Sequence, residues 1–185
     1  MPDILSGIFI TLNHSNMQKP SSITYPGFFH QYINAVPESD LSDAFNVQLP
    51  VINSFLSSIS EERSTYAYAA GKWTIKEILQ HMIDTERIFS YRALCFSRKE
   101  EKMLPGFEQD DYVINATAND RTWHSLGNEF LIVRQSTHSL FNSFTDKMLT
   151  IDGHFNNMTN TTAGMGFIIL GHFYHHKKII EERYL

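Results

Sequence analysis

The sequence has 185 residues, a formal net charge of −5 and one cysteine. This length is typical of one domain with a substantial core. The negative charge and scattered basic residues argue against nucleic acid as the main partner, because binding phosphates requires a basic surface. A single cysteine excludes an intrachain disulfide framework and indicates a reducing compartment. With no apolar stretch of about 18 residues and no clear signal peptide, we predict a cytoplasmic protein that does not bind a membrane.

The N-terminal part of the chain gives weak structural signals. Residues 1–20 have no clear helical or strand period, and we predict a disordered leader there, followed by a single domain over residues 21–185. Met17 is an alternative start of the chain. Aromatic residues and prolines alternate over residues 21–37, which favours an irregular segment packed on the domain, with a short helix at Phe28–Val36.

Two long helices are predicted in the first half of the domain. The first begins near Ser39, a residue that can cap a helix N-terminus, and keeps a helical period of apolar residues to Ile59. Pro50 lies inside this period, so we expect it to kink the helix without ending it. The second helix begins with the capping box Thr74-Ile-Lys-Glu77 and runs to about Arg98.

The connections on either side of the second helix differ in length. Residues 60–72 are predicted as a loop, and residues 99–119 as a long connection. A connection this long in a compact domain is often functional or covers a site. A third helix begins near Asp120 or Thr122 and carries apolar residues at helical spacing as far as Phe144.

The last helix is predicted from Asn160 or Thr161 nearly to Leu185, after a turn region at residues 150–160 in which we expect no strand. Glycines within a helix cost roughly 1 kcal/mol each relative to alanine, so close packing against a neighbouring helix must offset that cost. These glycines are Gly164, Gly166 and Gly171. Four long periodic helices without a convincing strand predict an all-α fold, a four-helix bundle.

The last helix also carries the main chemical signal. His172 and His176 are four residues apart, so their imidazoles lie on one helix face about one turn apart. Two neutral imidazoles at this spacing suit a divalent transition metal, and His81, which we expect to face inward from the second helix, can supply a third. Surface histidines favoured by the helix dipole are the alternative. Burying three imidazoles without a metal, however, costs about 1–3 kcal/mol for each unsatisfied nitrogen.

The other histidines lack a partner at ligand spacing. His175 lies about 100° around the helix from His176, so we place it beside the metal ligands or in solvent, with the alternative that it replaces one of them. His124 and His138 are expected to be exposed or to cap a helix.

Acidic residues near His81 have two interpretations of about equal weight. Asp84 either accepts a hydrogen bond from an imidazole or from metal-bound water, with a role in proton transfer, or forms an ion pair with Arg87 or Lys76. Glu86 is expected to pair with Arg87 or Arg92.

Three segments in this order resemble the DinB-like (damage-inducible) superfamily, which includes the bacillithiol- and mycothiol-dependent transferases. They are Gly71-Lys-Trp-Thr-Ile-Lys-Glu-Ile-Leu-Gln-His-Met-Ile-Asp-Thr-Glu-Arg87, Leu104-Pro-Gly-Phe-Glu108 and Gly171-His-Phe-Tyr-His-His176. The resemblance implies a bundle with a long crossover connection, usually a homodimer. It also implies a nickel- or zinc-type metal on three histidines, which match His81, His172 and His176, with water or substrate completing the coordination.

Two functions fit these features. In an enzyme acting on a small molecule, the metal lowers the pKa of bound water or of a low-molecular-weight thiol toward about 7, for hydrolysis or thiol S-transfer respectively. In a non-catalytic, stress-related bundle, the metal instead joins the second and fourth helices. An empty site that retains only the fold is disfavoured, because all three ligand positions are histidine.

Overall fold

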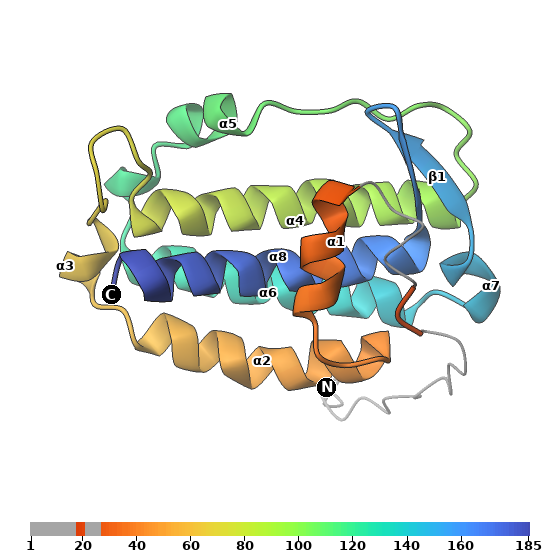
Figure 1. The fold of residues 1–185 in the computed structure, drawn as a ribbon, viewed down its shortest axis with the longest axis horizontal. Coiled ribbons are helices and arrows are strands. Elements are labelled where there is room, and N and C mark those ends of the chain that lie inside the picture. The colour runs from red at the N-terminus through yellow and green to blue at the C-terminus, as the bar shows by residue number, and fades with distance from the viewer. Residues whose placement is uncertain (1–17, 21–26) are drawn as a thin grey trace, which may run out of the picture.

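The computed structural model describes residues 18–20 and 27–185. The predicted disordered leader and the alternative start at Met17 therefore lie almost entirely outside the described residues. The dominant feature is a set of four long helices (Figure 1). They are α2 (Leu41–Ser57), α4 (Ile75–Ser97), α6 (Trp123–Asn142) and α8 (Thr162–Arg183). The predicted four-helix bundle is confirmed.

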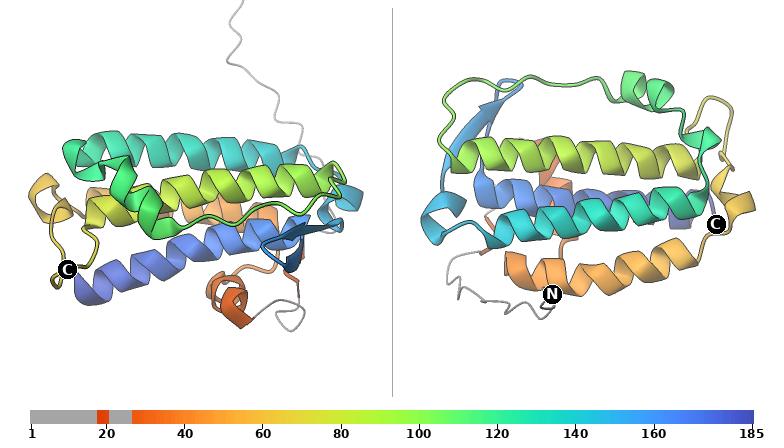
Figure 2. Two further views of the ribbon diagram at one scale, coloured as in Figure 1. Left: turned by 90° about the horizontal axis from the view of Figure 1, so that it is seen from above. Right: turned by 180° about the vertical axis from the view of Figure 1, so that it is seen from behind.

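The bundle contains a long crossover connection. Helices α4 and α6 lie side by side and run in the same direction, while α2 and α8 run in the opposite one (Figures 1 and 2). Because parallel neighbours cannot be joined by a short turn, the chain returns along the whole bundle between α4 and α6. This connection was predicted as loop throughout, but it contains α5 (Gln109–Ala116) and the 3-10 turn η2 (Ala118–Asp120). Helix α5 was not predicted because Val113 is its one buried residue, and a single apolar position does not produce a helical period in the sequence.

Side-chain caps determine where the long helices begin. The Thr74 hydroxyl accepts from the amide of Glu77, and the Glu77 carboxylate accepts from the Thr74 amide at 2.7 Å, so the predicted capping box is confirmed. Thr122 and Thr161 cap α6 and α8 with their own hydroxyls. Each of these helices therefore begins at a position that the sequence had indicated.

Helix α2 begins slightly later than predicted. Asp40, rather than Ser39, is the capping residue, and its carboxylate accepts from two amides of the first turn at 2.9 and 3.1 Å. The helix continues past Pro50, as expected, because the missing amide of one proline does not remove the buried apolar face on either side of it.

The shorter elements lie at the ends and on one side of the bundle. They are α1 (Gly27–Ala35), α3 (Glu61–Ser64), α7 (Asp146–Leu149), β1 (Asp152–Phe155) and β2 (Met158–Thr161). Helix α1 agrees with the predicted short helix to within one residue. Helix α3 lies in a segment predicted as loop, and its four residues are too few to produce a period.

The prediction of no strand at residues 150–160 was wrong. Strands β1 and β2 form an antiparallel hairpin, and Asn156 and Asn157 make its turn with positive φ values of 45° and 59°. Asparagine tolerates this left-handed conformation, which two-residue hairpins favour. Gly153 packs against α4, since a Cβ at this position would lie 1.7 Å from the Phe96 ring. Four-residue strands are too short to show alternation, so the asparagine pair was the usable signal.

Helix α1 crosses α8 near its middle (Figure 1). Gly171 permits this close approach, because a Cβ there would lie 1.8 Å from the carbonyl oxygen of Tyr32. Gly166 has a similar role against α2, with Leu41 at 2.7 Å from the position of its absent Cβ. The expected close packing at these two glycines is confirmed.

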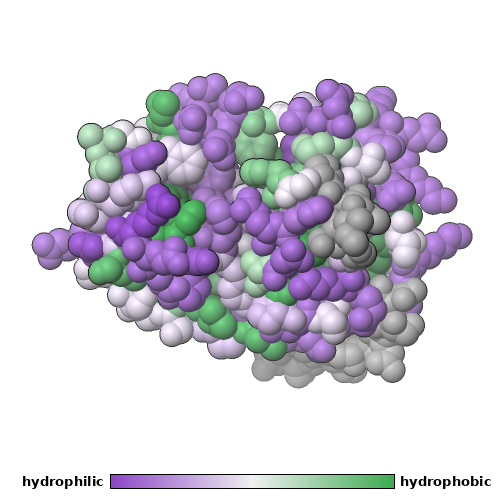
Figure 3. All heavy atoms as spheres, in the orientation of Figure 1, coloured by the Kyte–Doolittle hydropathy of each residue, from purple (hydrophilic) through white to green (hydrophobic). Residues whose placement is uncertain are grey.

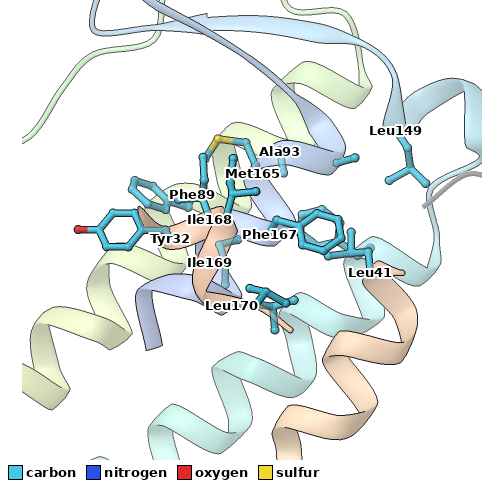
Figure 4. Packing of buried hydrophobic residues seen from close by; sticks show 14 of the residues in the cluster. Tyr32, Leu41, Phe89, Ala93, Leu149, Met165, Phe167, Ile168, Ile169 and Leu170 are labelled. Atoms are coloured by element: carbon cyan, nitrogen blue, oxygen red, sulfur yellow. The ribbon is translucent and has the colours of Figure 1, made fainter. Parts of the chain in front are cut away.

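Helix α8 is the central element of the core. Every residue from Thr162 to Phe173 is buried, which explains the uncharged run in this part of the sequence. Figure 4 shows side chains from α1, α2, α4 and α8 meeting in the larger of two apolar clusters. On the surface, polar side chains cover most of the face in Figure 3, with smaller apolar areas between them. None of the helices within the described residues is long and apolar enough to span a membrane.

Candidate metal centre

Three histidine side chains from two helices meet inside the bundle. His81 comes from α4, while His172 and His176 come from α8, the neighbouring helix. The Nε2 atom of His172 lies 3.1 Å from Nε2 of His81 and 3.0 Å from Nε2 of His176. One nitrogen from each of the three lies within 4.8 Å of the other two. The geometry thus brings together the three residues predicted as ligands.

Neighbouring side chains hold the rings in place. Trp73 lies 5.0 Å from the His81 ring, and Tyr32 of α1 meets the His172 ring edge-on at 5.4 Å. On the far side of His81, the Nδ1 atom lies 3.5 Å from the Thr85 hydroxyl. A proton on Nδ1 directed at Thr85 leaves the Nε2 lone pair facing the other two histidines.

The three imidazoles are held in the neutral form. Burial lowers the pKa of His81 to about 4, with a smaller contribution from the charge of His175. Burial also lowers the pKa of His172 and of His176 well below the ordinary value, and the other histidines lower both further. Neutral imidazole is the form that binds a metal ion, so protons compete weakly for these nitrogens at neutral pH.

The donor set fits a divalent transition metal. A nitrogen of a neutral imidazole can donate or accept one hydrogen bond, so three that face one point cannot all be satisfied by each other. An ion bound by three lone pairs satisfies all of them. Nitrogens about 2.0–2.1 Å from a tetrahedral ion are separated by roughly 3.4 Å, close to the separations found here. Three imidazoles without a carboxylate suit zinc, nickel or copper better than magnesium or calcium.

His175 lies outside this cluster. Its ring is partly buried and contacts Tyr32 at 5.2 Å and His176 at 5.0 Å, as measured between ring centroids. This agrees with its expected place beside the ligands rather than among them. His124 is exposed as predicted and hydrogen-bonds to Asn128 at 2.9 Å.

The prediction for His138 was wrong, because it is neither exposed nor a cap. Its ring is partly buried and stacks on Phe45 of α2 at a centroid distance of 5.0 Å. Among the described residues its Nε2 atom is buried without a hydrogen-bond partner. This face of α6 packs on α2, a contact that the sequence of α6 alone does not specify.

Asp84 makes its contacts away from the three histidines. It accepts a hydrogen bond from Gln80 at 3.0 Å and lies 3.9 Å from Arg87, so the predicted ion pair with Arg87 is present in a long form. Burial raises the pKa of Asp84, although its polar neighbours partly oppose this. Its side chain lines a surface depression with Gln80 and Arg121 instead of the pocket that reaches His81. Lys76, the other predicted partner, pairs with Glu61 at 2.5 Å.

Glu86 belongs to a buried ionic network, and the pairing predicted for it was wrong. Its carboxylate accepts two hydrogen bonds from Arg134 of α6, at 2.8 and 2.9 Å, instead of pairing with a neighbour on α4. Arg134 also donates to Gln48 of α2, whose amide donates to the Leu170 carbonyl of α8 at 2.9 Å. The network therefore connects all four long helices beside His172.

A pocket of about 300 Å³ reaches His81 and His172 from the surface. Its walls come from α1, α4, the crossover connection and the β1–β2 hairpin. Nearly half of the lining residues are aromatic or apolar: Phe28, Phe29, Tyr32, Phe89, Phe107, Phe155 and Met158. Larger depressions elsewhere on the described surface do not include any of the three histidines. The pocket gives a small molecule access to one side of the histidine cluster.

Comparisons with known proteins agree with this architecture. The family model of the DinB superfamily matches residues 44–180. The chain belongs to the DinB superfamily. A comparison with curated proteins finds no match.

Among solved structures, the chain is similar to YfiT from Bacillus subtilis, described as "a probable metal-dependent hydrolase with an unusual four-helix bundle topology". The TM-score is 0.63 at 14% sequence identity, covering 76% of this chain and 84% of that chain. At this identity the similarity shows a shared fold. It confirms the bundle, and the family model confirms the predicted family. The thiol, the nickel or zinc identity of the metal, the homodimer and the cytoplasmic location remain predictions.

Proposed function

We propose that this DinB-superfamily protein is a metal-dependent hydrolase of small molecules, with a divalent transition metal on the Nε2 atoms of His81, His172 and His176. The observation that carries the proposal is the convergence of three neutral imidazoles, two of them buried and lining an open pocket. The description of YfiT as a probable metal-dependent hydrolase supports the proposal, because the two proteins share a fold. Thiol-dependent S-transfer remains a second prediction for the same histidines.

The residues around the site have separable roles in this reaction. A divalent metal on three imidazoles supplies a Lewis acid that lowers the pKa of bound water to about 7. Thr85 and Trp73 orient His81, and Tyr32 orients His172, so the three lone pairs remain directed at one point. The aromatic walls of the pocket exclude bulk water and hold the apolar part of a substrate beside the histidines. The contacts of Asp84 lie away from the histidines, so a role in proton transfer requires that Asp84→Asn lowers the rate of turnover.

Hydrolysis with and without the histidine site tests the proposal. Zinc- and nickel-loaded protein is assayed against a panel of small esters and amides, with and without added low-molecular-weight thiols. The variants His81→Ala and His172→Ala are expected to lose bound metal and at least about 100-fold in rate, since even weaker perturbations of metal sites cost 10–100-fold. The variant His124→Ala is the matched control, because His124 is an exposed histidine outside the cluster. Equal rates in His81→Ala and His124→Ala would overturn the proposal.

The same experiment separates hydrolysis from the alternatives. Turnover that requires an added thiol would establish S-transfer instead. Metal bound stoichiometrically without any turnover would favour the non-catalytic bundle, in which the ion joins α4 to α8.

A further inference from the structure

Arg92 occupies the same pocket as the histidine cluster. It follows His81 by eleven residues on α4, or about three helical turns, so the two side chains share one helix face. Arg92 is 4% exposed and lines the pocket together with His81 and His172. Arg92 was predicted as a possible partner of Glu86, whereas in the structure it lines the cavity.

Aromatic rings, and no carboxylate, surround the guanidinium group. Its central carbon lies 4.3 Å from the Phe155 ring, 5.3 Å from Phe89 and 5.9 Å from Phe107. Its one hydrogen bond within the described chain runs to the Pro105 carbonyl at 2.8 Å. The ion pairs of the described residues all involve other basic groups. Glu108 lines the mouth of the pocket but is exposed and is not within ion-pair distance.

Two buried arginines of this bundle can be compared directly. Arg134 is 2% exposed and is neutralised by a bidentate contact with Glu86. Arg92 is almost as buried but has no such partner, and burial lowers its pKa to about 10. It remains charged at neutral pH. A buried guanidinium with unused N–H donors is costly unless an anion is supplied. Arg92 borders two hollows, a depression of about 320 Å³ beside Tyr91 and Tyr112 and the pocket of about 300 Å³, and the pocket is the one that also reaches the histidines.

We propose that Arg92 is the anion-binding residue of this pocket and that the molecule acted on at the histidine site is a small carboxylate with an apolar body. This proposal rests on the proposed function, because it assigns a substrate class to the same site. The planar guanidinium matches the two oxygens of a carboxylate. The pocket offers one buried cation, Arg92, and an exposed carboxylate, Glu108, also lines it. A ligand with a single negative charge therefore fits better than a doubly charged phosphate group, which Glu108 would repel more strongly.

The pocket places the two ends of such a molecule at different residues. The Phe89 ring lies 5.3 Å from the guanidinium carbon and 6.4 Å from the His172 ring, so it is within reach of both polar ends. The apolar body packs on Phe89, the carboxylate binds Arg92 and the reacting bond faces the histidines. A volume of about 300 Å³ is at the lower end for ligand sites and suits a molecule of this size.

Binding of a matched acid and amide tests this assignment. The probes are 3-phenylpropanoate and 3-phenylpropanamide, which have the same shape and differ in charge, and their dissociation constants are measured by NMR titration. Metal-free protein is used, so that the carboxylate cannot simply coordinate the ion. We expect the wild type to prefer the acid by at least about tenfold, roughly 1.4 kcal/mol, and Arg92→Gln to lose this preference. Arg92→Lys should keep part of it, because it keeps the charge.

Arg98→Gln is the matched control. Arg98 follows α4 directly and also lies near an aromatic ring, Phe144 at 5.8 Å, but it does not line the pocket. Its variant should bind the acid as the wild type does. Equal affinity for acid and amide in the wild type would overturn the proposal, as would an unchanged preference in Arg92→Gln. If Arg92→Gln does not fold, the comparison of acid and amide in the wild type still decides, because equal affinities would overturn the proposal.

The outcome is independent of the proposed function. If the wild type shows no preference for the acid, the substrate assignment fails, but metal binding and hydrolysis are still tested separately by the histidine variants. Conversely, a protein that binds no metal can still show the acid preference in this assay. A third probe, 2-phenylethylphosphonate, checks the kind of anion: tighter binding of the phosphonate than of the acid would overturn the carboxylate assignment.

Discussion

At the scale of single residues, the neutral state of the three clustered histidines explains most of the chemistry of the site. Burial, more than any charged neighbour, lowers the pKa of His81 to about 4 and the pKa of His172 well below its ordinary value. The same burial would penalise an imidazolium in the folded protein. Each histidine therefore links the stability of the metal-free protein to pH.

The metal-free protein is expected to lose stability as the pH falls from about 6.5 to about 4. Over this range the unfolded chain binds a proton at His81 that the folded chain excludes, so the free energy of unfolding decreases. The contribution of His81 is fully present above the unfolded pKa and its loss is on the order of 3 kcal/mol. Urea denaturation at several pH values measures it. His81→Gln should show a shallower dependence than the wild type, and identical slopes would contradict this account.

At the scale of elements, the crossing of α1 over α8 supports the site. Gly171 lets the two helices approach until the Tyr32 carbonyl occupies the place of a Cβ. Tyr32 then contacts both His172 and His175 with its ring. The arrangement of the histidines inside this bundle thus depends on a helix that is outside it.

Gly171→Ala is expected to destabilise the protein by at least about 1–3 kcal/mol, because the new methyl group meets backbone, which cannot rotate away. Gly127→Ala on α6 is the control, since the nearest atom to its Cβ lies 3.5 Å away, an ordinary contact. That change should stabilise α6 by up to about 1 kcal/mol through helix propensity. Thermal denaturation of both variants gives the comparison. Similar effects from the two substitutions would show that α1 does not pack closely at Gly171.

At the scale of the whole molecule, the histidine cluster joins parts of the chain that are far apart in sequence. His81 and His172 are 91 residues apart and belong to different helices. These two residues come together only when the protein is folded, so a metal ion binds both of them in the folded state and not in the unfolded chain. The buried network of Glu86, Arg134 and Gln48 connects the same two helices without a metal, through an ion pair and hydrogen bonds that reach the Leu170 carbonyl of α8.

Added metal is therefore expected to stabilise the folded protein. At a free metal concentration 100 times the dissociation constant, the gain is about 2.7 kcal/mol, which raises the melting temperature by roughly 5–10 °C for a chain of this length. Calorimetry of chelator-treated protein, with zinc or nickel then added back, measures the shift. His81→Ala should show no shift with metal. An unchanged melting temperature of the wild type would show that the histidines do not bind the ion tightly in the folded state.

Local signals in the sequence determined the helices and the candidate ligands. The capping box at Thr74, the threonine caps of α6 and α8, and the pair His172 and His176 are all read within a few residues, because capping and helical spacing act over one turn. The inward position of His81 followed from the apolar period around it. These signals sufficed for the bundle and for the three histidines.

Only the tertiary structure decided which distant side chains meet. It paired Glu86 with Arg134, 48 residues away, and left Arg92 without a carboxylate at the wall of a pocket. It also brought α1 across Gly171 and folded residues 152–161 into a hairpin. These outcomes depend on how helices and connections pack against each other, and a pattern with the period of one helix contains no information about the partner on the next.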